Sequence, residues 1–158
     1  MPGEQVVQQP ASTATPLLLS SDSTAEPEGC WEPPDDYSRV WVGDMQFNAR
    51  TLAMLDHAQA LYDAQAGESG GVVDFRQALT QGSYNAGGVA ASFGTHDGGG
   101  AVDLSVRSRV DFSVLTDEIE PMLWALRTAG FAAWLRDTDE LYLTSPIHIH
   151  AIAVGDQD

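Results

Sequence analysis

Three of the four histidines of the chain lie in two short segments whose residue types suit metal binding. His96 and Asp103 are the first and last residues of "HDGGGAVD", which contains three consecutive glycines. His148 and His150 follow in "IHIHAIAV", where the alternation predicts a strand with both imidazoles on one face. Imidazole nitrogens and carboxylate oxygens are common zinc ligands, so these four residues are candidates for a metal site.

The glycine triplet bears on whether His96 and Asp103 meet in space. Consecutive glycines lose much conformational entropy on folding, so a sharp turn or a close approach of the chain must favour them. A turn would let both side chains point to one place, whereas a flexible loop would explain the glycines without a site. Spacing alone allows two donor sets, either Asp103 with histidines or the three histidines His96, His148 and His150.

The elements that would position these residues mix helices with antiparallel strands. Apolar spacing predicts a helix from its N-cap Asn48 to Gly67, with His57 at an exposed or core-edge position, and a second helix over 114–129. Strands are expected over 72–80, 101–106, 131–136 and 141–154, the last two joined into a hairpin by a "DTDE" turn. No βαβ regularity is visible, which favours the α+β class.

The chain is expected to form one domain over residues 35–158, preceded by a flexible tail. Residues 1–34 are rich in Pro, Ser, Thr, Gln and Glu and lack a periodic apolar pattern. The first residues contain no basic n-region, so no signal peptide is predicted. Cys30 is the only cysteine, which rules out an intrachain disulfide.

The charge of the chain restricts its partners. Among 158 residues there are 23 acidic side chains and seven basic ones, all arginine, for a net charge of −16. No basic face is available to neutralise phosphates, which argues against nucleic acid and against anionic membrane surfaces. No apolar run reaches membrane-spanning length, so no membrane insertion is expected. The acidity fits a solubilising surface, with adaptation to salt or a cationic ligand as alternatives.

The metal-donor segments resemble those of a known enzyme family. "HDGGGAVD" fits the pattern H-x-x-G-x-A-x-D through His96, Gly99, Ala101 and Asp103, and an H-x-H follows later in the chain. This combination is similar to the signature of the zinc D-alanyl-D-alanine carboxypeptidase and endolysin family, peptidase family M15. The segment "QGSYNAGGVAASFGTH" also resembles the family's approach to its first histidine. The resemblance covers roughly residues 72–155.

The resemblance implies a Hedgehog/DD-peptidase-like α+β fold, a small and mostly antiparallel sheet with flanking helices. It also implies one Zn²⁺ held by His96, Asp103 and His150, with a water in the fourth position. His148 would assist the reacting groups beside the metal. The implied activity is hydrolysis of peptide bonds in bacterial peptidoglycan, in an extracellular, cell-envelope or viral lysis setting.

Two positions depart from the family pattern. No acid stands a few residues before His150 to act as general base, and Glu140 would lie about 26 Å from His148 along an extended strand. Gln81 occupies about the position at which the family has an arginine that binds the substrate carboxylate, so Gln81 is the candidate substrate-binding residue. The nearest preceding arginine, Arg76, is five residues earlier. These departures keep open a non-catalytic zinc-stabilised domain that binds cell-wall or other peptides. A purely structural acidic domain with incidental histidines is a third possibility.

Overall fold

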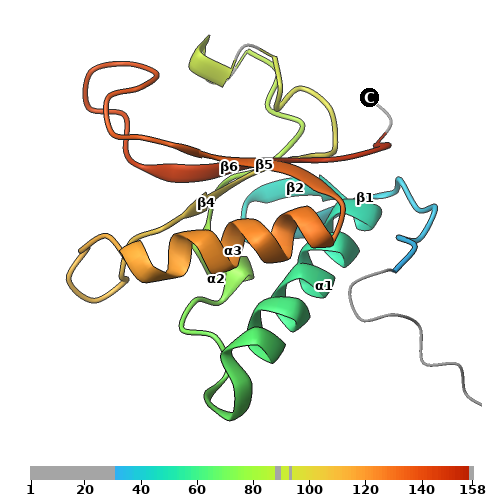
Figure 1. Cartoon of the computed structure of the whole chain (residues 1–158). Helices are drawn as coiled ribbons and strands as arrows, with labels where there is room; N and C mark the ends of the chain where they lie inside the picture. Colours follow the sequence, from blue (N-terminus) through green and yellow to red (C-terminus); the bar gives the residue numbers. More distant parts are fainter. Residues whose placement is uncertain (1–30, 88–89, 93, 157–158) are drawn as a thin grey trace, which may run out of the picture.

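The computed structural model, which describes residues 31–87, 90–92 and 94–156, contains two antiparallel sheets and two long helices (Figure 1). The larger sheet has the order β3-β4-β6-β5, formed by β3 Leu79–Gln81, β4 Ala101–Ser105, β6 His148–Ala153 and β5 Phe131–Arg136. β1 Arg39–Val42 and β2 Met45–Asn48 form a hairpin, which an isolated bridge between Gln46 and Ser83 ties to the chain just after β3. The expected α+β class is therefore confirmed.

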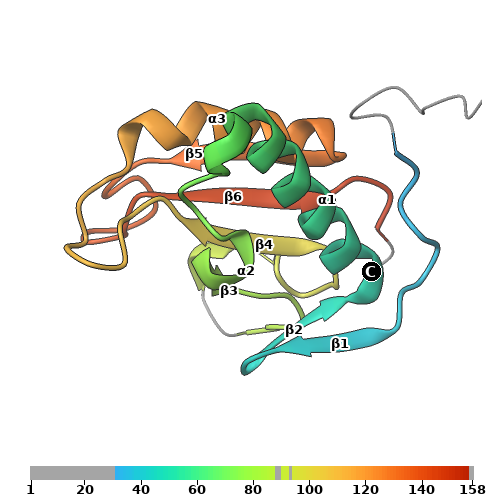
Figure 2. The ribbon, with the colours of Figure 1, turned by 90° about the horizontal axis from the view of Figure 1, so that it is seen from below.

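The two long helices begin and end close to where the sequence signals predict. α1 Ala49–Ala66 follows Asn48 and ends at Gly67, whose φ of 73° lies in the left-handed region that suits glycine. α3 Thr116–Thr128 has acidic side chains in its first turn and Arg127 in its last, as the helix dipole favours. Both helices cover the same face of the larger sheet (Figure 2). None of the described helices combines the length and apolar character needed to span a membrane.

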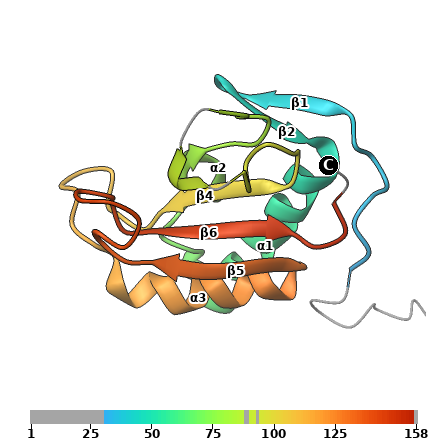
Figure 3. The ribbon, with the colours of Figure 1, turned by 90° about the horizontal axis from the view of Figure 1, so that it is seen from above.

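Alternation along the strands divides the larger sheet into a core face and an open face. The side chains that join the apolar core beneath the helices are Val102, Leu104, Phe131, Ala133, Ile149 and Ala151. Their neighbours Asp103, His148 and His150 must point the other way because successive strand residues alternate sides. That opposite face is the one seen from above in Figure 3. The fold thus separates the apolar core from the candidate metal donors.

The expected strand over 72–80 is wrong for most of its length. Only its last two residues are extended, at the start of β3, and they follow a single helical turn, α2 Phe75–Ala78. Asp74 caps this turn, since its carboxylate accepts a hydrogen bond from the Gln77 backbone N–H at 2.9 Å. A local capping interaction therefore prevailed over the apolar alternation. Two short 3₁₀ turns, η1 Gly67–Ser69 and η2 Ala90–Ser92, complete the described elements.

The hairpin of β5 and β6 forms, but its connection is much longer than the expected "DTDE" turn. Residues 137–147 contain no strand, and β6 starts only at His148. Within this connection the Asp139 N–H bonds to the Ser145 carbonyl at 3.0 Å, and the Ser145 N–H bonds to Tyr142. These bonds fold the segment on itself, so the expected strand start at residue 141 is wrong.

The expected tail lies mostly outside the described residues, which begin at Trp31. The ring of Trp31 stacks against His57 of α1 with centroids 4.7 Å apart. Arg50, also on α1, donates a hydrogen bond to the Pro33 carbonyl at 3.1 Å. These last residues of the expected tail therefore contact the first helix.

Candidate metal centre

Three side chains that the sequence singled out meet on the open face of the larger sheet. The atoms that cluster are Nε2 of His96, Oδ1 of Asp103 and Nδ1 of His150, and all three residues are buried. Nε2 of His96 lies 3.3 Å from each of the other two atoms. Atoms about 2.0–2.1 Å from a tetrahedral zinc lie roughly 3.3–3.4 Å from one another, and two of the three distances match this value. Nδ1 of His150 and Oδ1 of Asp103 are closer, at 2.6 Å, and would have to move apart to bind such an ion.

Strand register places two of the three donors opposite each other. Asp103 on β4 and His150 on β6 are direct partners in the antiparallel pair. Nδ1 of His150 is 2.6 Å from Oδ1 of Asp103, a hydrogen bond that a bound cation would replace. The ring of His150 also packs edge-on against Trp134, its register partner on β5, with the ring centroids 4.9 Å apart. Neighbouring strands therefore fix the orientation of both side chains.

The third donor, His96, is held by the loop that precedes β4. Its Nδ1 is 2.8 Å from the Gly82 carbonyl, and because a carbonyl only accepts, Nδ1 carries the proton. The lone pair of Nε2 is thereby directed at Asp103 and His150. This outer-shell arrangement is the usual one for a metal-ligating histidine, because it fixes both the tautomer and the ring orientation.

Two of the three consecutive glycines are explained by close packing. A Cβ at Gly99 would overlap the side chain of Asn48, and a Cβ at Gly100 would overlap Asp156. Asn48 is completely buried, donates a hydrogen bond to Asp156 and accepts one from the Tyr84 hydroxyl. The loop that carries His96 therefore packs directly on a buried polar network. The metal-donor segment needs glycine because no side chain fits there.

The ionised form of Asp103 is favoured in this cluster. Burial raises the pKa of its carboxyl, but the hydrogen bond from His150 and the nearby His96 imidazole, which donates to the carboxylate when Nε2 is protonated, more than offset burial and hold the pKa well below its usual range. Within the described part of the chain, the ion-pair contacts of Asp103 are all to histidines. A buried carboxylate between imidazoles is a donor set that suits a divalent cation such as zinc.

His148 lies beside the three donors rather than among them. It sits two residues before His150 on β6 and shares its face of the sheet. Its Nδ1 donates a hydrogen bond to the Pro146 carbonyl at 2.8 Å. Its Nε2 is 3.8 Å from Oδ2 of Asp103, so the ring nitrogen with the free lone pair faces the cluster. The cluster found in the structure is therefore His96 with Asp103 and His150.

A cavity of about 330 Å³ opens over the donors, and His148 and Gln81 both contribute to its lining. Gln81 on β3 is the register partner of Asp103, and its Nε2 donates to the Ser92 hydroxyl at 3.0 Å. The structure thus brings the candidate substrate-binding residue to the donors. Arg76 instead pairs with Asp56 on α1 at 2.6 Å and does not line this cavity.

The sequence did not indicate the wall of the cavity formed by Arg136 and residues 141–146. Leu141, Tyr142, Ser145 and Pro146 come from the long connection between β5 and β6, and Arg136 is the last residue of β5. With the expected four-residue turn, Arg136 would have paired with Leu141, far from the donors. The actual register pairs Arg136 with His148. These residues reach the cavity because the connection is longer than the sequence predicted.

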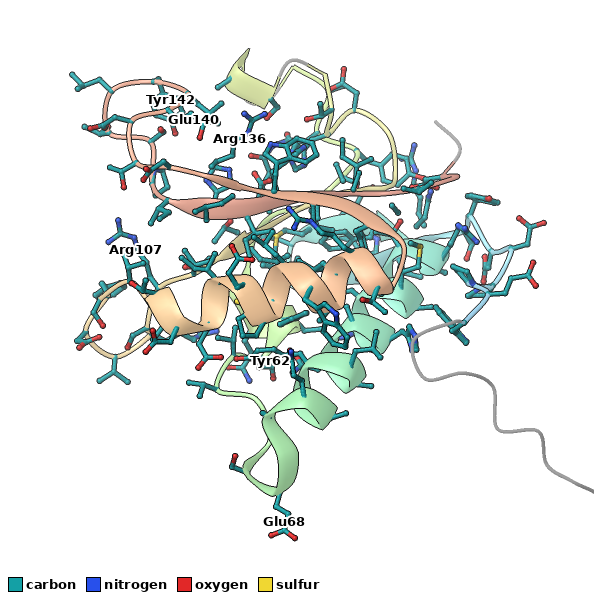
Figure 4. The ribbon with its side chains drawn as sticks, in the orientation of Figure 1. Tyr62, Glu68, Arg107, Arg136, Glu140 and Tyr142 are labelled. Carbon is teal, nitrogen blue, oxygen red and sulfur yellow. The ribbon has the colours of Figure 1, made fainter. Side chains whose placement is uncertain are left out.

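Glu140 is closer to the donors than a continuous strand would have placed it. Its carboxylate accepts hydrogen bonds from the Asp137 N–H at 2.7 Å and from Nη1 of Arg136 at 2.6 Å. These bonds, with the charge of nearby His148, lower the pKa of Glu140. The connection folds back (Figure 4), so the extended strand assumed between Glu140 and His148 does not form. Glu140 still does not line the cavity.

Comparisons of the chain with models of known protein families, with curated proteins and with solved structures find no significant match.

Proposed function

We propose that the chain is a zinc-dependent hydrolase that cleaves peptide bonds in bacterial cell-wall peptides. The observation that carries this proposal is the buried triad of His96, Asp103 and His150 beneath a cavity. The sequence pattern around these residues resembles that of peptidase family M15. The α+β arrangement, with helices on one face and donors on the other, is compatible with the Hedgehog/DD-peptidase fold that the resemblance implies.

Three protein donors are the number found in catalytic zinc sites, which keep one position open for water or substrate. When bound, zinc would lower the pKa of its water toward neutrality and polarise the scissile carbonyl. The protein supplies a fixed donor geometry, since two ligands lie on paired strands and the tautomer of the third is set by Gly82.

His148 is the residue that we assign to proton transfer. The Pro146 carbonyl holds the proton of its imidazole on Nδ1, which leaves the lone pair of Nε2 facing the donors. In its neutral form Nε2 can accept a proton from a reacting group, and in its protonated form it can return that proton to a leaving amine. The cavity of about 330 Å³ provides room for a short peptide segment over these nitrogens.

Gln81 is assigned to substrate binding at one side of the cavity. It lies on β3, next to the strand of Asp103, and its amide already reaches the cavity wall at Ser92. An amide can donate to a substrate carbonyl or carboxylate, but it lacks the charge of the family's arginine. Gln81 therefore favours recognition of a peptide group as much as of a free carboxyl terminus.

The test is hydrolysis of purified peptidoglycan by the zinc-loaded protein, by chelated protein and by chelated protein with zinc restored. We expect peptide fragments or D-alanine in the first and third samples and none in the second. His148→Ala should retain zinc and lose most of the release. A fully zinc-loaded protein that releases nothing from peptidoglycan or from synthetic cell-wall peptides would exclude the hydrolase.

A second candidate function is a zinc-stabilised module that binds cell-wall or other peptides without cutting them. It is favoured by one observation, that Asp103 is the sole carboxylate among the described residues lining the cavity. No separate acid is thus placed there as a general base. In this case chelation should lower the melting temperature, and the protein should co-sediment with peptidoglycan in a zinc-dependent manner without releasing fragments.

A further inference from the structure

The cavity over the metal donors has a cationic side opposite Gln81. In the sheet order β3-β4-β6-β5, Gln81 lies on one outer strand and Arg136 on the other, with Asp103 and His150 between them. Arg136 is the sole Lys or Arg among the described residues that line the cavity. Figure 4 shows it on the open side of the sheet, together with Glu140 and Tyr142.

The position of Arg136 is fixed by its surroundings. Its guanidinium lies 5.2 Å from the ring centroid of Trp134, and Nη1 bonds to Glu140 at 2.6 Å. About 30% of the side chain remains exposed. A guanidinium carries five N–H donors in a planar fork, so an ion pair through Nη1 leaves it able to bind a second carboxylate.

The overall charge makes this one cation distinctive. The chain carries a net charge of −16, so an anionic ligand is repelled by most of the surface. At the cavity, a bound divalent cation and Arg136 would together make the local net charge positive. Leu141, Tyr142 and Pro146 add an apolar wall on the same side. This side of the cavity therefore combines a carboxylate-binding fork with apolar contact surface.

We propose that Arg136 binds a carboxylate of the peptide ligand, on the side of the metal opposite Gln81. The inference takes from the proposed function only that the ligand is a peptide. The carboxylate comes from an acidic side chain or from a free carboxyl terminus, since both present the same two oxygens to the fork. Glu140 competes for the guanidinium, so it tunes the affinity for the ligand.

The test is calorimetric titration of three short peptides into zinc-loaded and metal-free protein. The first peptide is N-acetyl-alanyl-glutamate amide, the second is its glutamine counterpart, and the third is N-acetyl-alanyl-glutamine with a free carboxyl terminus. We expect wild-type protein to prefer at least one carboxylate peptide over the neutral peptide. Comparison of the first and third shows which source of carboxylate is bound.

Two substitutions should shift this preference in opposite directions. Arg136→Gln should weaken binding of the carboxylate peptide about 10- to 100-fold, because charge-assisted hydrogen bonds are lost, and leave the neutral peptide unchanged. Glu140→Gln should tighten binding of the carboxylate peptide, because the competing carboxylate is removed. The amide oxygen of glutamine can still accept the hydrogen bond from the Asp137 N–H. Arg109→Gln, which removes an exposed arginine outside the cavity, is the control for net charge.

The proposal fails if wild-type protein shows no carboxylate preference, or if Arg136→Gln behaves like Arg109→Gln. It also fails if Arg136→Gln weakens binding of the neutral peptide as much as binding of the carboxylate peptide. Titration of metal-free protein separates this result from the fate of the proposed hydrolase. If the protein prefers carboxylate peptides but never cleaves peptidoglycan, the Arg136 subsite stands and only the proposed hydrolase activity is excluded.

Discussion

Asp103 and His150 face each other directly across β4 and β6, with Nδ1 of the imidazole 2.6 Å from Oδ1 of the carboxylate. Both are buried on a sheet face whose opposite side is covered by the two long helices. Asp103 therefore orients His150, and in the proposed site it is also a metal donor. The loss of its charge should affect the centre more than the loss of one ligand alone.

Asp103→Asn should weaken zinc binding by more than the roughly 10- to 100-fold typical of losing an outer-shell partner. The amide keeps the shape of the carboxylate but removes the charge that faces two imidazoles. Zinc content after gel filtration and competition with a chromogenic chelator measure the change. His57→Gln is the matched control, since His57 lies on α1 beside Trp31. Equal zinc content in both variants would contradict the assigned donor set.

His148→Ala should separate metal binding from catalysis. The side chain lies 3.8 Å from Asp103 and is not one of the three clustered donors, so zinc affinity should change little. If Nε2 transfers a proton in the reaction, the turnover number should fall about 10²- to 10⁴-fold. Loss of zinc in this variant would instead make His148 a ligand.

Gly99→Ala should destabilise the protein by about 1–3 kcal/mol, as overpacking of a tight interior does. The added methyl group would overlap the buried side chain of Asn48. Urea unfolding with and without Asn48→Ala tests the contact. The effect of Gly99→Ala should be smaller when Asn48 is already truncated, because the two sites are coupled. Additive effects would show that the strain arises elsewhere.

The stability of the protein should fall as the pH rises from about 10 to about 12. Burial, together with the hydrogen bond to Glu118, raises the pKa of Tyr62 to about 12. The ordinary tyrosine pKa is about 10, so over this range the unfolded chain loses a proton that the folded protein keeps. Tyr62→Phe should flatten this part of the profile in chemical unfolding. Tyr142→Phe, on the exposed connection, is the matched control.

The parts of the fold that the sequence predicts well are those set by local signals. α1 Ala49–Ala66 begins directly after Asn48 and ends before Gly67, as the sequence predicts, although the Asn48 side chain makes no capping hydrogen bond to the helix. The alternation in "IHIHAIAV" correctly places His148 and His150 on one face of β6. The glycine triplet correctly marks a close approach, although the contacting residues, Asn48 and Asp156, are far away in the sequence.

The parts that the sequence could not predict depend on register and on contacts distant along the chain. A four-residue turn after Arg136 agrees with composition as well as the actual connection over 137–147 does. The pairing of Arg136 with His148 and the backbone bond from Asp139 to Ser145 distinguish the two. A shift in register moves each strand residue to a new partner, so the sequence could not predict that Arg136 lies beside His148.

The metal donors and the cavity wall belong to structurally different parts of the chain. Asp103 and His150 lie on central strands, whereas Leu141 and Tyr142 lie on a connection whose two ends are fixed by β5 and β6. A loop anchored in this way can change in length at little cost in free energy. We expect that exchanging residues 137–145, which leaves Pro146 and its bond to His148 in place, would change which ligands fit the cavity and would leave the three clustered donors intact.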